Sequence, residues 1–179
     1  MSIEANGIDR VPRVGFDVGN VILRNDTDSP ELSFSQRPQY YLDGAVEVID
    51  RTVHALKPEN AFIISKCGPN MQERTLEFFD EHDFYGNTGF KRGHVLFCLN
   101  RADKAPIAAD LGLTHFVDDR LDILQSLVTV DTRMLFRRQE KEPVNPKLLG
   151  SGDKAIRIAH NWDDVWDILV ETIPDLKAA

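Results

Sequence analysis

The sequence predicts an α/β fold in which a central, mainly parallel β-sheet lies between two layers of helices. Three observations support this prediction: short apolar runs recur along the 179 residues, amphipathic stretches separate them, and polar residues stand where several of the runs end. Strands that alternate with helices are typical of a parallel sheet covered on both faces. We therefore expect a three-layer α/β/α, Rossmann-like architecture.

The apolar runs are the predicted strands. Each is continuous and of strand length, a pattern typical of strands that are buried on both faces. The predicted strands are 14–18, 61–65, 94–99, 114–118, 133–136 and 155–159.

The stretches between these runs predict helices, because apolar residues recur there at three- and four-residue spacing. The clearest is 161–172, where Asn161 can cap the helix and Asp163 and Asp164 fall in its first turn, at the positive end of the helix dipole. The others are 45–56, 70–81, 106–111 and 121–127.

Two segments do not follow the alternation. Residues 24–41 contain Asp26, Asp28, Pro30 and Pro38, and they predict a long loop or flap; we take 24–43 as a flap or minimal cap insertion. Residues 139–152 are charged and contain Pro and Gly, which predicts a surface excursion. The length suits one ordinary domain, so we expect 1–179 to form a single domain.

The amino-acid composition limits the classes of binding partner and the cellular location that we expect. The formal charge of −8 argues against a general nucleic-acid or membrane-surface binder, because both partners are anionic. The two cysteines, Cys67 and Cys98, lie in apolar surroundings and predict reduced thiols. Residues 1–10 carry no apolar segment typical of a secretion signal, and no apolar run is long enough to cross a bilayer. We therefore expect a cytoplasmic protein.

Residues with useful chemistry stand at the carboxyl ends of predicted strands, where ligands bind in open α/β sheets. Asp17 ends the first strand and precedes a Gly-containing turn, so it is either exposed at the sheet edge or a turn cap. Ser65 ends the second; its hydroxyl can bind a phosphate oxygen, although serine there is usually turn chemistry.

An acidic pair follows a later strand. Asp118 and Asp119 repel each other, which favours a bound cation, or they begin the next helix. Lys104 opens the preceding helix, so its ammonium group can lie over the strand ends. Lys66 and Lys91 compete for that role.

Together these features resemble the haloacid-dehalogenase (HAD) superfamily of hydrolases. Asp17 matches the nucleophile of the family's first motif, and Ser65 matches the hydroxyl residue of its second. Lys104 matches the lysine of the third motif, and Asp118 and Asp119 match the acidic fourth motif. The order of the motifs and their placement at strand ends both agree with the family.

The resemblance implies a Mg²⁺-dependent phosphatase. Asp17 would attack phosphorus and form an aspartyl-phosphate, which water then hydrolyses. The implied ligands of Mg²⁺ are Asp17, the backbone carbonyl of Gly19, Asp118 and Asp119. The implied phosphate-binding groups are Ser65, Lys66, Lys104 and the turn residues Val18 and Gly19.

One position departs from the family's phosphatase pattern. That pattern places a second Asp two residues after the nucleophile, where it protonates the leaving group, but here Gly19 follows in an Asp-x-Gly-Asn motif. Three interpretations stay open. Another group or water takes the proton, as in similar members that look like sugar-phosphate phosphatases; the substrate has a good leaving group; or the protein is a catalytically weak or inactive HAD-fold binding or regulatory protein. Among the histidines, His82 is a more plausible substitute acid than His94 or His115.

The family often places specificity in a cap domain. The two insertion points, 24–43 and 66–103, are too short for a large cap, so we expect an open site. Open members tend to act on large substrates or to use a partner subunit as a lid. The expected partner is therefore a small-molecule or macromolecular phosphate ester, and a homodimer is one expected assembly.

Overall fold

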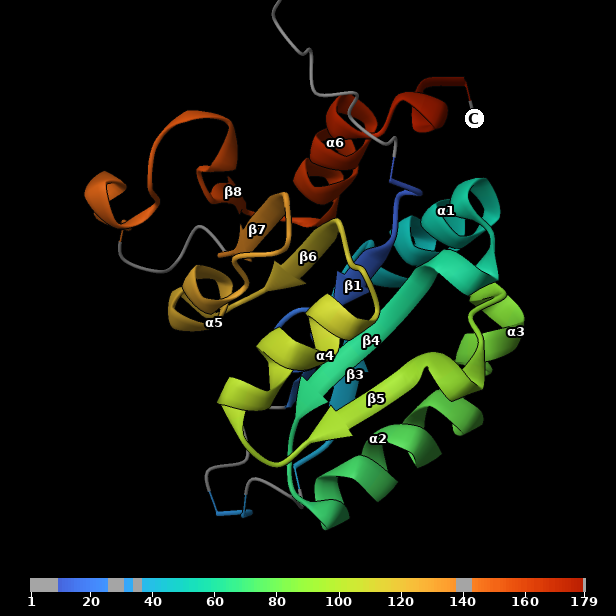
Figure 1. Cartoon of the computed structure of the whole chain (residues 1–179). Helices are drawn as coiled ribbons and strands as arrows, with labels where there is room; N and C mark the ends of the chain where they lie inside the picture. The colour runs from blue at the N-terminus through green and yellow to red at the C-terminus, as the bar shows by residue number, and fades with distance from the viewer. Residues whose placement is uncertain (1–9, 26–30, 34–36, 138–142, 179) are drawn as a thin grey trace, which may run out of the picture.

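The computed structural model describes residues 10–25, 31–33, 37–137 and 143–178. Its centre is a six-stranded sheet in which every neighbouring pair runs parallel, in the order β5-β4-β1-β6-β7-β8 (Figure 1). The strands are β1 (Val14–Phe16), β4 (Ala61–Lys66), β5 (Val95–Cys98), β6 (His115–Asp118), β7 (Thr132–Phe136) and β8 (Arg157–Ala159). All six predicted strands are thus confirmed, with ends that differ by a residue or two.

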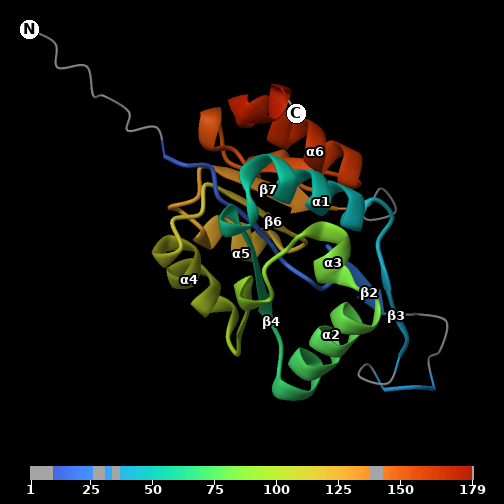
Figure 2. The ribbon, with the colours of Figure 1, turned by 90° about the vertical axis from the view of Figure 1, so that its right-hand side faces the viewer.

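Helices cover both faces of the sheet, which confirms the three-layer α/β/α prediction. Figure 2 shows α4 (Lys104–Asp110) and α5 (Leu121–Ser126) on one side of the sheet, and α1 (Ala45–Leu56) and α6 (Trp162–Thr172) on the other. Two further helices, α2 (Pro69–Glu81) and α3 (Phe84–Thr88), lie on the side of α1. The short α3 was not predicted.

The strands divide their side chains between two hydrophobic clusters. Phe16, Ile63 and Val117 belong to the cluster under α1 and α6, whereas Ile64 and Phe116 belong to the cluster under α4 and α5. This alternation follows from the two-residue period of a strand. Because both faces are buried, the strands carry continuous apolar runs.

Gly15 makes room for two core side chains beside β1. A Cβ atom there would lie 2.5–2.7 Å from side-chain atoms of Phe116 and Leu113. Any larger residue would push these side chains out of the core. The glycine therefore leaves room for these two side chains on the face of the sheet where β1 and β6 pair.

Helix α6 is anchored at its first turn, as predicted. The Asn161 side chain accepts a hydrogen bond from the Asp164 backbone N–H at 2.8 Å. The next residue, Trp162, is buried against Phe16 and Phe136, and its indole N–H donates to the carbonyl of Val21 at 2.9 Å. A C-terminal helix thus holds the turn that follows β1.

The predicted flap is a hairpin rather than a plain loop. β2 (Leu23–Asn25) pairs antiparallel with β3 (Gln39–Tyr41), while residues 26–30 and 34–36 of the predicted flap lie outside the described residues. Tyr41 packs against aromatic rings of α2 and α3, namely Phe78, Phe79 and Phe84. The sequence missed these strands because each is three residues long and only half-buried.

The described insertions contain no large cap, in agreement with the prediction. Between β1 and α1 lies the hairpin, and between β4 and α4 lie α2, α3 and β5. Of the predicted excursion 139–152, residues 139–142 lie outside the described residues, and most of the rest are exposed. No described helix has the length and apolar character needed to cross a membrane.

Candidate active site

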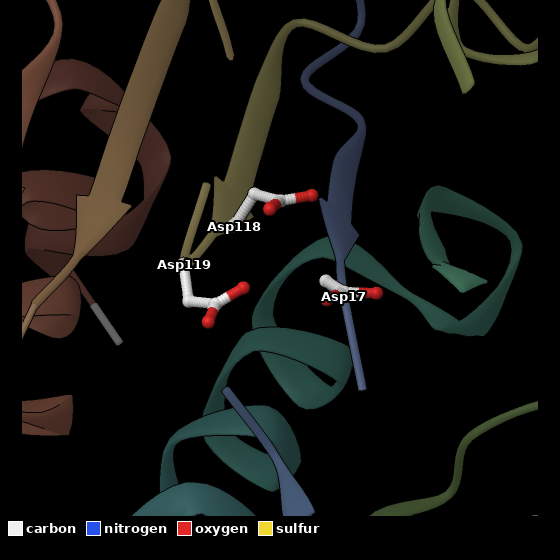
Figure 3. A group of neighbouring side chains, drawn as sticks. All are labelled: Asp17, Asp118 and Asp119. Carbon is white, nitrogen blue, oxygen red and sulfur yellow. The ribbon is translucent and has the colours of Figure 1, made fainter. Parts of the chain in front are cut away.

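Two predicted acidic residues meet at the carboxyl edge of the sheet. Asp17 follows β1 directly, and its backbone N–H donates to the carbonyl of Val117 at 2.9 Å. Because Phe16 is level with Val117 in the sheet, Asp17 is level with Asp118, the last residue of β6. Figure 3 shows Asp118 and Asp119 extending from the end of β6 beside Asp17. Asp17 is 7% exposed and Asp118 is fully buried.

Lys104 lies between the two carboxylates. Its Nζ is 2.9 Å from Asp17 Oδ1 and 2.7 Å from Asp118 Oδ2, and the residue is only 2% exposed. As predicted, it begins the helix that leads to β6. Of the competing lysines, Lys66 is exposed at the same edge of the sheet, at the end of β4, whereas Lys91 pairs with Glu59 at 3.7 Å.

Burial sets the electrostatics of this cluster. Burial raises the pKa of Asp118 above its ordinary value, and Asp17 raises it further, while Lys104 and the Arg120 N–H oppose the shift. For Lys104, burial lowers the pKa, but the two carboxylates together outweigh burial and hold it above its ordinary value. The lysine is therefore charged at neutral pH, and one cation faces more than one buried acid.

Asp119 adds a third carboxylate to the edge. One oxygen from each of Asp17, Asp118 and Asp119 lies within 4.8 Å of the others. If all three carboxylates are ionised, they and the Lys104 ammonium group sum to −2, the charge that a divalent cation would balance. Mg²⁺ prefers carboxylate oxygens as ligands, so the donor set, its spacing and its charge fit this ion.

The remaining predicted ligands flank these carboxylates. Ser65 is 6% exposed in β4, the strand next to β1, and lies one residue further toward the edge than the level of Asp17. Val18 is buried, and Gly19 is exposed beside Asp17. These placements bring Ser65, Val18 and Gly19 to the same sheet edge as the acidic cluster.

The turn after Asp17 is tightly bonded. The carbonyl of Val18 accepts the backbone N–H groups of Val21, Ile22 and Leu23 at 2.9–3.3 Å. A Cβ atom added at Gly19 would meet nothing within 4 Å. The position that the second Asp takes in the family's phosphatase pattern is therefore open space here, and packing does not require a glycine at it.

Asn20 is a site residue that sequence reasoning missed. Its side-chain Nδ2 donates to Asp119 Oδ2 at 3.1 Å, and its backbone has a left-handed φ of 56°. The available signal was an Asn next to Gly in a turn, a residue type that tolerates this conformation. That signal does not reveal the contact, which spans 99 positions in the sequence.

In the part of the chain that the structure describes, each histidine has hydrogen-bond partners away from the acidic cluster. His82 ends α2, and its Nδ1 lies 2.9 Å from the carbonyl of Phe78. His94 precedes β5 and contacts the carbonyl of Ala61, while His115 starts β6 at its opposite end. His54 pairs with Asp50, and His160 follows β8, the strand at the far edge of the sheet.

Both cysteines are free thiols near the ends of β4 and β5, as predicted. The backbone N–H of Cys67 donates to the carbonyl of Cys98 at 3.2 Å. Burial, with a smaller contribution from Asp17, raises the pKa of the Cys67 thiol to about 11. These thiols are therefore protonated at neutral pH and poor nucleophiles.

Comparison of the sequence with protein-family models and with curated proteins found no match. The resemblance to HAD hydrolases therefore depends on the four motifs and on the geometry in which their residues meet.

Proposed function

We propose that this protein is a cytoplasmic, Mg²⁺-dependent HAD-like phosphatase that hydrolyses a phosphate ester through an aspartyl-phosphate on Asp17. One observation carries the proposal: Lys104 contacts both Asp17 and Asp118 at the carboxyl edge of a parallel sheet, with Asp119 beside them. A buried cluster with excess negative charge is costly unless a cation completes it. Its place at the strand ends is where open α/β sheets bind ligands.

The contacts support a proposed role for each side chain. Lys104 holds Asp17 by Oδ1, which leaves Oδ2 to attack phosphorus. Asp118 accepts the Lys104 ammonium at one oxygen and the Arg120 backbone N–H at the other, at 2.7 and 2.9 Å, so its orientation is fixed. Mg²⁺ bound by the three carboxylates would screen the repulsion between the phosphate and Asp17.

The reaction then has two steps. Asp17 forms a bond to phosphorus while the bond from phosphorus to the leaving oxygen breaks. Water next attacks the same phosphorus, which releases inorganic phosphate and restores the Asp17 carboxylate. Ser65 and Lys104 bind the phosphate oxygens. Because Gly19 has no side chain, the leaving oxygen takes its proton from water, and substrates with good leaving groups react faster.

An assay with an aryl phosphate tests this function, because aryl leaving groups need no acid. We expect hydrolysis that requires Mg²⁺ and falls to background in Asp17→Asn. Asp50→Asn makes the same chemical change on α1, where Asp50 pairs with His54, and should keep the wild-type rate. Full activity in Asp17→Asn would rule out the aspartyl-phosphate.

A second candidate is a HAD-fold binding protein that turns over slowly or not at all. The open space at Gly19 favours it, since general acid–base catalysis contributes roughly 10²–10⁴-fold in rate. It predicts Mg²⁺ and phosphate-mimic binding, seen as thermal stabilisation, without hydrolysis of any phosphate ester in a broad panel. A rate well above background on a natural phosphomonoester would exclude it.

A further inference from the structure

Asp119 differs from the other two carboxylates of the acidic cluster. Asp17 and Asp118 are buried and touch Lys104, whereas Asp119 is half-buried. A half-buried carboxylate has more freedom to turn toward solvent than a buried one. Mg²⁺ demands near-ideal octahedral geometry, so the orientation of Asp119 affects the affinity of the cluster.

Asn20 provides a contact that limits this freedom. Its Nδ2 lies 3.1 Å from Asp119 Oδ2. A donor on one carboxylate oxygen restricts the rotation of the group, and a carboxylate has further lone-pair sites with which to bind a cation. The amide is neutral, so it neither competes with the cation, as a lysine would, nor adds to the repulsion, as another acid would.

The backbone fixes the amide in place. The N–H of Asn20 donates to the carbonyl of Leu23 at 2.8 Å, within the same turn whose Val18 carbonyl accepts three N–H groups. Asn20 has a left-handed φ of 56°, a conformation that persists because the surrounding turn fixes the backbone there. The turn after β1 therefore presents the Asn20 side chain to the loop after β6.

We propose that Asn20 is a positioning residue that orients Asp119 for Mg²⁺. This inference rests on the magnesium site of the proposed function but not on hydrolysis. Groups that hold metal ligands from outside the coordination sphere typically change metal affinity by about 10- to 100-fold when removed. Asn20 acts through Asp119 and needs no contact with substrate.

Asn20→Gly is the main test, because glycine adopts the left-handed φ freely and removes only the amide. We expect titration calorimetry on the full chain to show a Mg²⁺ dissociation constant about 10- to 100-fold higher. The melting temperature of the metal-free variant should stay at or above that of the wild type. If the wild type hydrolyses an aryl phosphate, saturating Mg²⁺ should restore most of the variant's kcat.

Lys57→Gly is the matched control. Lys57 also has a positive φ, 70°, but it lies at the end of α1 that precedes β4. The substitution also replaces a side chain at a positive φ with glycine, but away from the acidic cluster. Its Mg²⁺ affinity should equal that of the wild type.

A double-mutant cycle separates orientation from general damage. In an Asp119→Asn background, Asn20→Gly should cause no further loss of Mg²⁺ affinity, because the group that it orients is already changed. An Asn20→Gly variant that binds Mg²⁺ as tightly as the wild type would overturn the proposal, and so would an equal loss in both backgrounds. A wild type that does not bind Mg²⁺ overturns the proposal together with the metal site, whereas Mg²⁺ binding without hydrolysis overturns only the phosphatase.

Discussion

Strand β6 begins and ends with a buried polar residue, and the protein surrounds these two residues with groups of different kinds. At its start, His115 Nδ1 lies 2.7 Å from the Thr114 hydroxyl, and Nε2 lies 3.0 Å from that of Thr172. The Thr172 hydroxyl donates to the Ile168 carbonyl at 2.6 Å, so its oxygen accepts the Nε2 hydrogen. These partners are neutral, and burial lowers the pKa of His115 to about 4.

At its other end, Asp118 is surrounded by charge. It faces Asp17 and Lys104 in a cluster whose acids outnumber its cation. The histidine end is complete within the protein, whereas the aspartate end has excess negative charge that a bound cation, or a proton on Asp118, would balance. The difference favours a structural role for His115 and a role in a binding site for Asp118.

The largest expected effect comes from removing the Lys104 ammonium group, which contacts both buried carboxylates at the aspartate end. Lys104→Met leaves two buried carboxylates facing each other, so the free energy of unfolding of the metal-free protein should fall by about 3–5 kcal/mol. Denaturant unfolding in the presence of a chelator measures this loss, and Mg²⁺ should restore part of it. The exposed Lys91→Met should change stability by less than about 0.5 kcal/mol. A loss no larger than that of Lys91→Met would mean that the two ends of β6 do not differ electrostatically.

The histidine end predicts a pH dependence. In the folded state the pKa of His115 is about 4, below the ordinary value of 6.5. The unfolded chain therefore binds the proton first as the pH falls. The stability that His115 contributes is complete above 6.5 and is lost as the pH falls from 6.5 to about 4. The separation of these pKa values corresponds to about 3 kcal/mol.

His115→Gln isolates this effect from the titration of the acidic residues. Its free energy of unfolding should fall less than that of the wild type between about pH 7.5 and pH 4.5. Parallel curves for the two proteins would show that His115 titrates normally, and the contrast between the ends of β6 would then be lost.

The smallest expected effect has the opposite sign. Burial and the Asp17 carboxylate raise the pKa of Asp118, so ionised Asp118 lowers stability as the pH rises through that raised value. Asp118→Asn removes the buried charge but keeps only one acceptor oxygen for Lys104 and the Arg120 N–H, so at about pH 8 the metal-free variant should gain stability only on the order of 1 kcal/mol. Mg²⁺ should then stabilise the wild type but not the variant. A variant that is clearly less stable without metal would show that Asp118 serves the fold rather than a cation.

Local sequence patterns predicted the long, regular elements of the fold. Helix α1 has the predicted bounds because its apolar residues keep a helical period over twelve residues. The hairpin β2–β3 and the five-residue α3 were missed because short elements carry too few periods to be recognised. Gly86 and Asn87 also make α3 a poor helix on propensity alone.

The candidate site was predictable only in part. The strand ends carried Asp17 and Asp118, but the choice among Lys104, Lys66 and Lys91 depends on how α4 packs over the sheet. The contact between Asn20 and Asp119 joins two loops far apart in the sequence. Neither the lysine choice nor this contact leaves a local pattern, because tertiary packing alone creates them.

The central claim is that Asp17 becomes phosphorylated during turnover, and chemical trapping tests it most directly. Borohydride reduces an acyl phosphate to an alcohol, so quenching the reaction of an aryl phosphate with borohydride should convert Asp17 into homoserine, detected by peptide mass spectrometry. We predict this conversion at Asp17 in the presence of Mg²⁺ and its absence without substrate. Hydrolysis that proceeds at full rate with an unmodified Asp17 peptide, or with homoserine at another aspartate, would contradict the account.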